Sequence, residues 1–375
     1  MERRNNFDLL RLLAAISVIF SHAYLIAEGT QDNEPFYRLT GQQSPLGVVG
    51  VFIFFTMSGF LVTQSFETTK SPLRYAAKRL LRIYPGYIAC LLVLGFVLGP
   101  LVTSLPLAEY LSHPRFRTFL IWNLMMDPNQ NELPGVAFTG NPVGQVVDGP
   151  LWTLPCELMM YALVMLLGMA RLLTFKMLGF LLVIGLICIG FDTTKSDDLM
   201  GSVGWLMPFF VAGVALYKLQ GTRLFDGKWA LLALVGLILS AMVGKMGLPF
   251  PPFILLFPIF GSYLTIWLAL NQRLPVIPAA KFGDFSYGLY IYGWPAEQLL
   301  AWISGGTLAT LPLFLGALVL SLGLSALSWH LIEKRALRLK PRPDHSASSA
   351  RPAGVSLQTS QSGFKGLENQ GSAQP

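Results

Sequence analysis

Long apolar runs separated by short polar segments dominate the chain up to about residue 340. Runs of about 20 apolar residues are long enough to cross a bilayer as helices, and the pattern predicts about ten of them. They cover residues 7–27, 47–66, 85–103, 151–170, 174–191, 200–218, 229–244, 250–270, 284–303 and 308–332. A further run at 116–126 is too short to cross unaided and is predicted to be re-entrant or interfacial. We therefore expect an all-α polytopic membrane protein.

The composition supports this class. Of the 375 residues 53% are hydrophobic and 13% are charged, and the mean hydropathy is +0.55, whereas a soluble domain carries about 25% charged residues. The first apolar run is too long and too polar for a signal peptide, so we keep it in the mature protein. Cys90, Cys156 and Cys188 fall within apolar runs. We expect them to be buried small hydrophobes rather than a disulfide framework or a metal site.

The basic residues predict the orientation. Most of the 27 Lys and Arg residues fall in alternate loops on one side of the predicted helices, beginning with Arg3 and Arg4. This side is expected to be cytoplasmic, which places both termini inside. The net charge of +7 is thereby explained by membrane orientation rather than by nucleic-acid binding. The opposite loops carry Arg38, Arg115, Arg117, Lys195 and Lys245.

Two segments differ from the rest. Residues 341–375 are rich in Pro, Ser, Gln and Gly and have few apolar side chains, so they are predicted to be a disordered cytoplasmic tail. Residues 1–340 then form one transmembrane domain. The longest outer loop, 104–150, is rich in Pro, Gly and Asn and is predicted to form a lid or an acceptor-binding surface.

The first apolar run contains ionisable residues, which are costly inside a membrane and are often functional there. Arg11 and His22 are eleven residues apart, so they share one helix face about 16 Å apart along the axis. Asp8 precedes Arg11 by three residues and can pair with it. The alternatives are that Arg11 extends to the cytoplasmic interface and that His22 is a hydrogen-bonded packing residue.

Glu157 is the predicted partner of His22. Counting inward from the outer ends of their helices, both residues lie about 8 Å below the outer interface. A carboxylate fixes the tautomer of an imidazole and raises its basicity, as a general base requires. The alternative is a structural Glu–His bond with no chemistry.

A second polar layer is predicted at the cytoplasmic edge. Arg79 and Arg82 share a helix face before the third span, an arrangement suited to binding phosphate groups bidentately. Ordinary anchoring of the helix by basic residues is the alternative. Ser286 and Tyr287 lie near the same edge, and Glu333 closes the last span.

Between the layers, Ser58 and Gly59 lie near the middle of the second span, where Gly59 is expected to allow close helix packing. No GxSxG, HExxH, Walker or Rossmann motif is present in the sequence. A transporter with a midplane site is an alternative, but the paired interrupted helices and repeats typical of such sites are not evident.

The sequence resembles the membrane acyltransferase-3 family, which includes O-acetylases of O-antigen, exopolysaccharide and peptidoglycan. The resemblance spans about residues 5–338. It rests on six motifs in order: FDLLRLLAAISVIFSH, GVFIFFTMSGFLVT, KRLLRIYPGY, GPLWTLPCELMMY, FGDFSYGLYIYGWP and LSWHLIEKRA.

The resemblance implies transfer of an acyl group, usually acetyl from acetyl-coenzyme A, to a hydroxyl of a glycan or lipid-linked sugar at the bacterial inner membrane. It implies that Arg11 and His22 are the family's Arg-x10-His pair, and that Arg79 and Arg82 meet the donor phosphates. The family's Trp-Ser-Leu-x-x-Glu motif matches Trp152, Thr153, Leu154 and Glu157, with Thr replacing Ser. Many members have a histidine late in the motif where this chain has YIYGWP, so no role is assigned to Tyr292.

The predicted mechanism has His22, oriented by Glu157, deprotonating the sugar hydroxyl for direct attack on the thioester. A covalent acyl-histidine is the alternative. Arg11 is counted with the catalytic residues, while Asp8, Ser58, Trp152, Thr153, Ser286, Tyr287 and Glu333 are predicted to bind substrate or support the site. The donor acyl-coenzyme A is a substrate rather than a resident cofactor, and no metal is required. A lipid-linked sugar transporter and an assembly partner in polysaccharide export are the competing classes.

Overall fold

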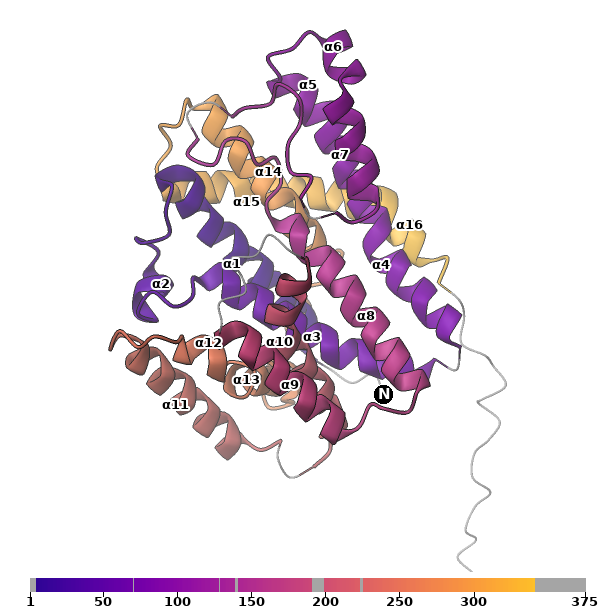
Figure 1. Ribbon diagram of the computed structural model, residues 1–375, viewed down its shortest axis with the longest axis vertical. Coiled ribbons are helices and arrows are strands. Elements are labelled where there is room, and N and C mark those ends of the chain that lie inside the picture. Colours follow the sequence, from indigo (N-terminus) through magenta and orange to yellow (C-terminus); the bar gives the residue numbers. More distant parts are fainter. Residues whose placement is uncertain are drawn as a thin grey trace, which may run out of the picture. The chain divides into compact units, whose positions relative to one another are not determined.

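The computed structural model describes residues 5–69, 71–127, 129–138, 141–190, 199–222 and 225–340. Within these ranges the chain is helical and contains no β-strand (Figure 1). The predicted tail, 341–375, lies outside the described residues.

The first half of the bundle contains α1 (Phe7–Glu28), α2 (Pro35–Leu39), α3 (Leu46–Thr68), α4 (Pro72–Val93), the π-helical turn η1 (Leu94–Leu98), α5 (Gly99–Val102), α6 (Leu107–Ser112) and α7 (Pro114–Leu124). The second half contains the 3₁₀ turn η2 (Pro150–Trp152), α8 (Thr153–Met169), α9 (Phe175–Gly190), α10 (Leu199–Lys218), α11 (Gly227–Gly244), α12 (Pro252–Leu256), α13 (Phe260–Leu270), α14 (Ser286–Ile303), α15 (Thr310–Ser328), the π-helical turn η4 (Trp329–Glu333) and α16 (Lys334–Leu337).

The predicted all-α membrane architecture is confirmed. In the described part of the chain, 7 helical stretches are long and apolar enough to cross a membrane. The other expected spans contain shorter or less apolar helices, among them α9 and α14, so the number of ten spans stays a prediction. The span expected at 250–270 is divided into α12 and α13, because Pro258 between them has no N–H to continue a helix. The short run predicted at 116–126 forms α7.

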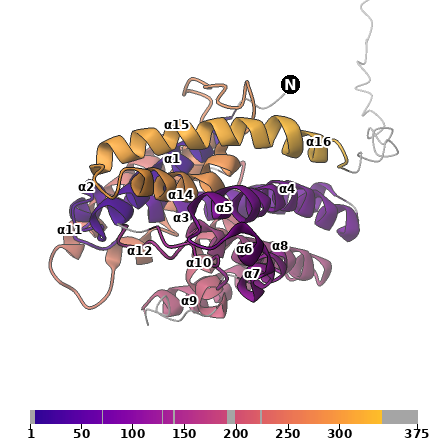
Figure 2. The same cartoon turned by 90° about the horizontal axis from the view of Figure 1, so that it is seen from above.

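Helix α3 lies at the centre of the bundle in both ribbon views, with α15 and α9 toward opposite faces (Figure 2). It crosses α10 at a point where both backbones carry glycine. A Cβ on Gly59 would lie 2.0 Å from the Phe210 carbonyl oxygen, and a Cβ on Gly213 would lie 2.0 Å from that of Thr56. The predicted packing role of Gly59 is therefore confirmed, since only glycine permits this approach.

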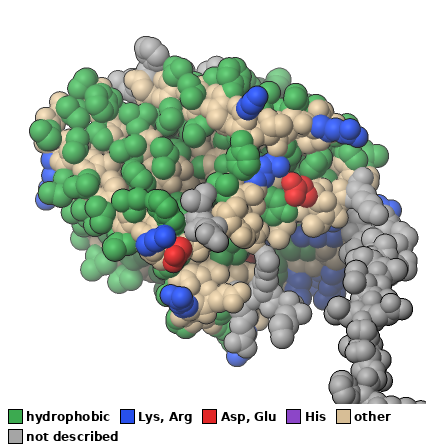
Figure 3. Space-filling view, turned by 90° about the horizontal axis from the view of Figure 1, so that it is seen from below, with side chains coloured by type: hydrophobic (Ala, Val, Ile, Leu, Met, Phe, Trp, Pro, Cys, Tyr) green, Lys and Arg blue, Asp and Glu red, His purple; other side chains and the backbone are tan. Residues whose placement is uncertain are grey.

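Much of the outer surface is apolar, as a surface in contact with lipid tails would be (Figure 3). Leu231 on α11 is 63% exposed and Val319 on α15 is 73% exposed. Such side chains would be unfavourable in water but not in hydrocarbon.

The segment before α8 enters the bundle instead of staying at its surface. The Trp294 indole N–H donates to the Val146 carbonyl at 2.9 Å, and the Gln298 amide donates to Val143 and Val146 at 2.9 Å each. Val147 and Asp148 are buried as a result. Helix α8 therefore begins well inside the protein, which determines how deep its side chains lie.

Candidate active site

A cavity of about 340 Å³ opens among basic side chains of α1, α4 and the segment after α16. Its cationic lining residues are Arg11, Arg79, Arg82 and Lys340, and we call it the arginine cavity. The only acidic residue that lines it within the described chain is Glu157. The lining therefore favours an anionic ligand.

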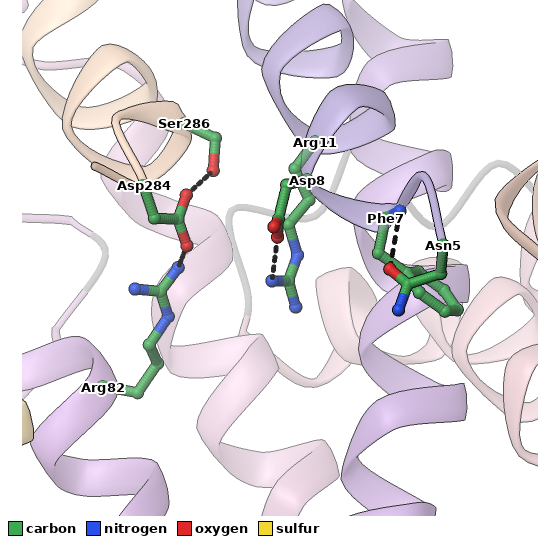
Figure 4. A network of polar contacts seen from close by, with 7 residues as sticks. All are labelled: Asn5, Phe7, Asp8, Arg11, Arg82, Asp284 and Ser286. Carbon is green, nitrogen blue, oxygen red and sulfur yellow. Dashed lines mark hydrogen bonds and ion pairs between the residues drawn. The ribbon is translucent and has the colours of Figure 1, made fainter. Parts of the chain in front are cut away.

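Arg11 and Arg82 are each held by a neighbouring carboxylate (Figure 4). The Arg82 Nη2 atom is 2.5 Å from Asp284 Oδ2, and Asp284 in turn accepts a hydrogen bond of 2.6 Å from the Ser286 hydroxyl. The Arg11 guanidinium is 3.9 Å from Asp8, so the predicted pair three residues apart is present. Asp284 thus orients Arg82, and its position before α14 was not predicted from the sequence.

Aromatic rings support the two arginines of α4. Arg79 lies over the Tyr161 ring and Arg82 over the Tyr287 ring, each with 5.9 Å between guanidinium carbon and centroid. Arg79 Nη2 donates to Ser65 at 3.3 Å, while its buried Nε has no hydrogen-bond partner among the described residues. A planar guanidinium held this way is ordered before any phosphate arrives, which reduces the entropic cost of binding.

Lys340 is a further cation of this cavity that sequence reasoning did not single out. Partial burial, together with repulsion from Arg82, Arg79, Lys78 and Arg11, lowers the pKa of its ammonium from 10.5 to about 8. In the sequence, the only signal for Lys340 was its place in a basic stretch after the last span. Its position beside the arginines of α4 depends on the fold.

Glu157 does not meet His22, and that part of the sequence-based mechanism is wrong. Its Oε1 accepts hydrogen bonds from Ser58 at 2.9 Å and from the Tyr161 hydroxyl. Glu157 lines the arginine cavity, together with Ser58 and Tyr161. The error arose because its depth was counted from the surface, whereas the segment before α8 already lies inside the bundle.

His22 faces Glu297 of α14 instead. The His22 Nδ1 and Glu297 Oε2 atoms are 4.0 Å apart, and the imidazole packs edge-on against Trp294 with ring centroids 4.9 Å apart. The His22 Nδ1 atom and both Glu297 carboxylate oxygens are buried, with no hydrogen-bond partner among the described residues. Unpaired buried groups are costly, so this pair is a strong candidate for a functional role.

A separation of 4.0 Å is too long for a direct hydrogen bond, and a shift of about 1 Å would form one. Catalytic hydrogen bonds often tighten only when substrate binds. With Nδ1 directed at the carboxylate, the Nε2 atom is left as the basic position of the ring.

Close packing of α1 against α14 creates this contact. A Cβ on Gly293 would lie 2.7 Å from Ile19, so glycine at this position lets the two helices approach closely. Glu297 follows one turn later and reaches the level of His22. A buried acid inside an apolar segment was a signal that could have identified it.

The remaining predicted residues lie around these two centres. Thr153 and Tyr290 share a hydrogen bond of 2.6 Å and both line the arginine cavity. Tyr287 donates to the Ile83 carbonyl at 2.9 Å, and the buried Glu333 accepts from Ser328 at 2.8 Å. His22 does not line the cavity. It contacts Trp294, about one turn further along α14 than the lining residue Tyr290.

Comparison with known proteins defines the family. Residues 4–330 match the acyltransferase-3 model, described as an acyltransferase domain. The chain belongs to the acyltransferase-3 family. This membership favours the enzyme over the transporter and the assembly partner that the sequence left open. The protein is therefore a multi-pass membrane acyltransferase.

Two curated relatives align with the acyltransferase over most of their length. The O-acetyl transferase of Shigella phage Sf6 is 31% identical over 346 residues, which cover 90% of this chain and 97% of the relative. Nodulation protein 10 of Rhizobium leguminosarum bv. viciae is 30% identical over 362 residues, which cover 90% of this chain and 94% of the relative. No solved structure matches the chain.

Proposed function

We propose that the protein is an O-acetyltransferase that moves an acetyl group from acetyl-coenzyme A to a hydroxyl of an exported glycan. The arginine cavity carries this proposal, because its cations would bind the phosphates of the donor. The name of the phage relative, O-acetyl transferase, supports the acetyl group and the oxygen acceptor.

The proposed orientation follows the basic residues. Arg11, Arg79 and Arg82 lie at the end of the bundle that the charge distribution assigns to the cytoplasm, where acyl-coenzyme A is made. His22 and Glu297 lie about 16 Å further out. The pantetheine arm would extend from the cavity past Thr153 and Tyr290 toward His22, and the glycan would approach from the outer side of the inner membrane.

The proposed reaction is a direct transfer. Nε2 of His22 takes the proton of the sugar hydroxyl as its oxygen attacks the thioester carbonyl carbon. The carbon–sulfur bond then breaks, and the coenzyme A thiolate leaves and receives the proton from His22. Glu297 faces Nδ1 and stabilises the imidazolium that forms between these two events.

Arginine substitutions test the donor assignment. Purified protein should cleave acetyl-coenzyme A when glycan acceptor is present, and Arg82→Ala should raise the donor KM about 10- to 100-fold through loss of charge-assisted hydrogen bonds. Arg82→Lys should recover this only in part, because lysine lacks the bidentate fork. Release of coenzyme A thiol is the measurement, and Arg79→Ala should behave similarly.

A short thioester without the nucleotide provides the internal control. Its turnover should be unaffected by either arginine change, because it has no phosphates to bind. Arg115→Ala is a matched variant, since Arg115 pairs with the exposed Glu132 at 3.0 Å, away from the cavity. Equal losses with both donors would show that the arginines support the fold rather than the donor.

Lys340 predicts a pH dependence of donor binding. Its ammonium is charged below a pKa of about 8, so its attraction for phosphate is present at neutral pH and is lost as pH rises through that value. Phosphate monoesters have a second pKa of about 6, so their charge changes little as the pH rises through the pKa of Lys340. The donor KM should therefore rise between about pH 7 and 9, and Lys340→Gln should flatten the rise. An unchanged profile in the variant would contradict this role.

A further inference from the structure

A second cavity, of about 870 Å³, lies at the opposite end of the bundle from the arginines. Separate segments line it: the turn after α2, the loops before α8 and α12, and the start of α10. The charge distribution assigns all of these segments to the outer side. The fold thus gathers several distant outer segments around one space, which we call the outer cavity.

The described part of the outer cavity's lining is aromatic and uncharged. It presents Tyr37, Trp152, Trp205 and Phe250 together with side-chain amides and hydroxyls, including Gln42 and Ser202. None of the described residues that line it is Asp, Glu, Lys, Arg or His. The arginine cavity, by contrast, carries several cations.

This combination fits a neutral sugar. The apolar faces of a sugar ring pack on aromatic rings, while amides and hydroxyls both donate to and accept from its hydroxyl groups. An acidic sugar or a lipid pyrophosphate would find no cation among the described residues of the lining and would lose hydration without compensation from them.

Parts of the wall are fixed before any ligand binds. Trp205 packs against Phe52 with ring centroids 5.2 Å apart. Gln42 has a φ of 61°, uncommon for a residue with a side chain, and its N–H donates to the Tyr37 carbonyl at 2.7 Å. Such backbone conformations cost free energy and often occur at binding sites.

The outer cavity also adjoins the arginine cavity. Trp152 lines the outer one and the next residue, Thr153, lines the inner one. On α3, Val48 lines the outer cavity and Val51, about one turn later, lines the arginine cavity. At these two places the linings of the two cavities are therefore about one helical turn apart or less.

We propose that the outer cavity binds a neutral sugar unit of the acceptor and thereby selects neutral glycans over acidic ones. This inference rests on the proposed function, and it adds the chemical class of the acceptor and the residues that would recognise it.

Cysteine protection tests the site without relying on transfer. The full-length purified Gln42→Cys variant, which also carries Cys188→Ala, is labelled with a maleimide. Cys90 and Cys156 are buried, so they can remain. The probes are oligosaccharides from the surface glycan of the parent cells, divided into neutral and acidic pools by anion exchange. The neutral pool should slow labelling about tenfold at ten times its dissociation constant, and the acidic pool should not. Asp32→Cys, in an outer loop outside the cavity, should be unaffected.

Labelling in intact cells links the site to function. An impermeant maleimide should react with Gln42→Cys and Asp32→Cys, while Leu73→Cys at the cytoplasmic start of α4 should react only after the membrane is opened. Labelled Gln42→Cys should lower glycan O-acetyl content about tenfold, and labelled Asp32→Cys should not. Ser202→Cys replaces Gln42→Cys as the reporter if the latter fails to accumulate.

The possible failures are distinguishable. Protection by the acidic pool, protection by neither pool, or full acetylation after labelling would overturn the neutral-sugar site and leave the acetyltransferase intact. Unchanged glycan acetylation in a deletion strain would instead contradict the proposed function, whereas the protection assay would still decide what the cavity binds.

Discussion

His22→Gln should lower kcat for acetyl transfer by about 10³-fold or more, within the range expected for loss of a general base. Glutamine keeps a polar side chain of similar size against Trp294 but cannot accept and return a proton. The donor KM should change little, because His22 does not line the arginine cavity. Coenzyme A release in the presence of acceptor measures the effect, and glycan O-acetylation in cells should fall in parallel.

His330→Gln is the matched control, since His330 is exposed on the turn η4. Its kcat should equal that of the unaltered enzyme. A His22→Gln enzyme that retained more than about a third of normal kcat would show that His22 is a packing residue and that another group takes the proton.

Glu297→Gln should lower kcat by up to about 10⁴-fold, the loss seen when the acid that orients a catalytic histidine is replaced by its amide. The substitution preserves shape but removes the carboxyl group that faces Nδ1 and that would stabilise the imidazolium. Glu297→Asp should recover part of the rate. The donor KM should stay unchanged, because Glu297 is remote from the arginine cavity.

Glu157→Gln is the informative comparison, because sequence reasoning assigned the role of His22 partner to Glu157. Glu157 lies with Ser58 and Tyr161 beside the arginines, so its replacement should act mainly on the donor KM. If Glu157→Gln lost kcat and Glu297→Gln did not, the partner of His22 in the working enzyme would be the one predicted from the sequence.

The sequence by itself determined the class of the protein and much of its inner polar layer. Apolar runs of membrane-spanning length require helices, because backbone groups in lipid must be satisfied within the segment. Helical periodicity alone predicted the Asp8–Arg11 pair and placed Arg79 and Arg82 on one face. These features are local, so a regular helix was enough to derive them.

Contacts between helices were decided only by the tertiary structure. A helix that is apolar on all sides does not reveal which face meets which neighbour, so the contact between His22 and Glu297 required the close packing of α1 on α14 at Gly293. The return of Lys340 to α4 likewise depends on how the last helices fold over the bundle.

The misplacement of Glu157 has the same origin. Depth counted along the sequence assumes that every loop stops at the membrane surface, but Trp294 and Gln298 bind the loop before α8 inside the bundle. The outer cavity, too, is formed by segments far apart in sequence. Local periodicity fixes the angle of a side chain around its own helix, whereas its depth and its partner depend on long-range packing, which only the folded chain specifies.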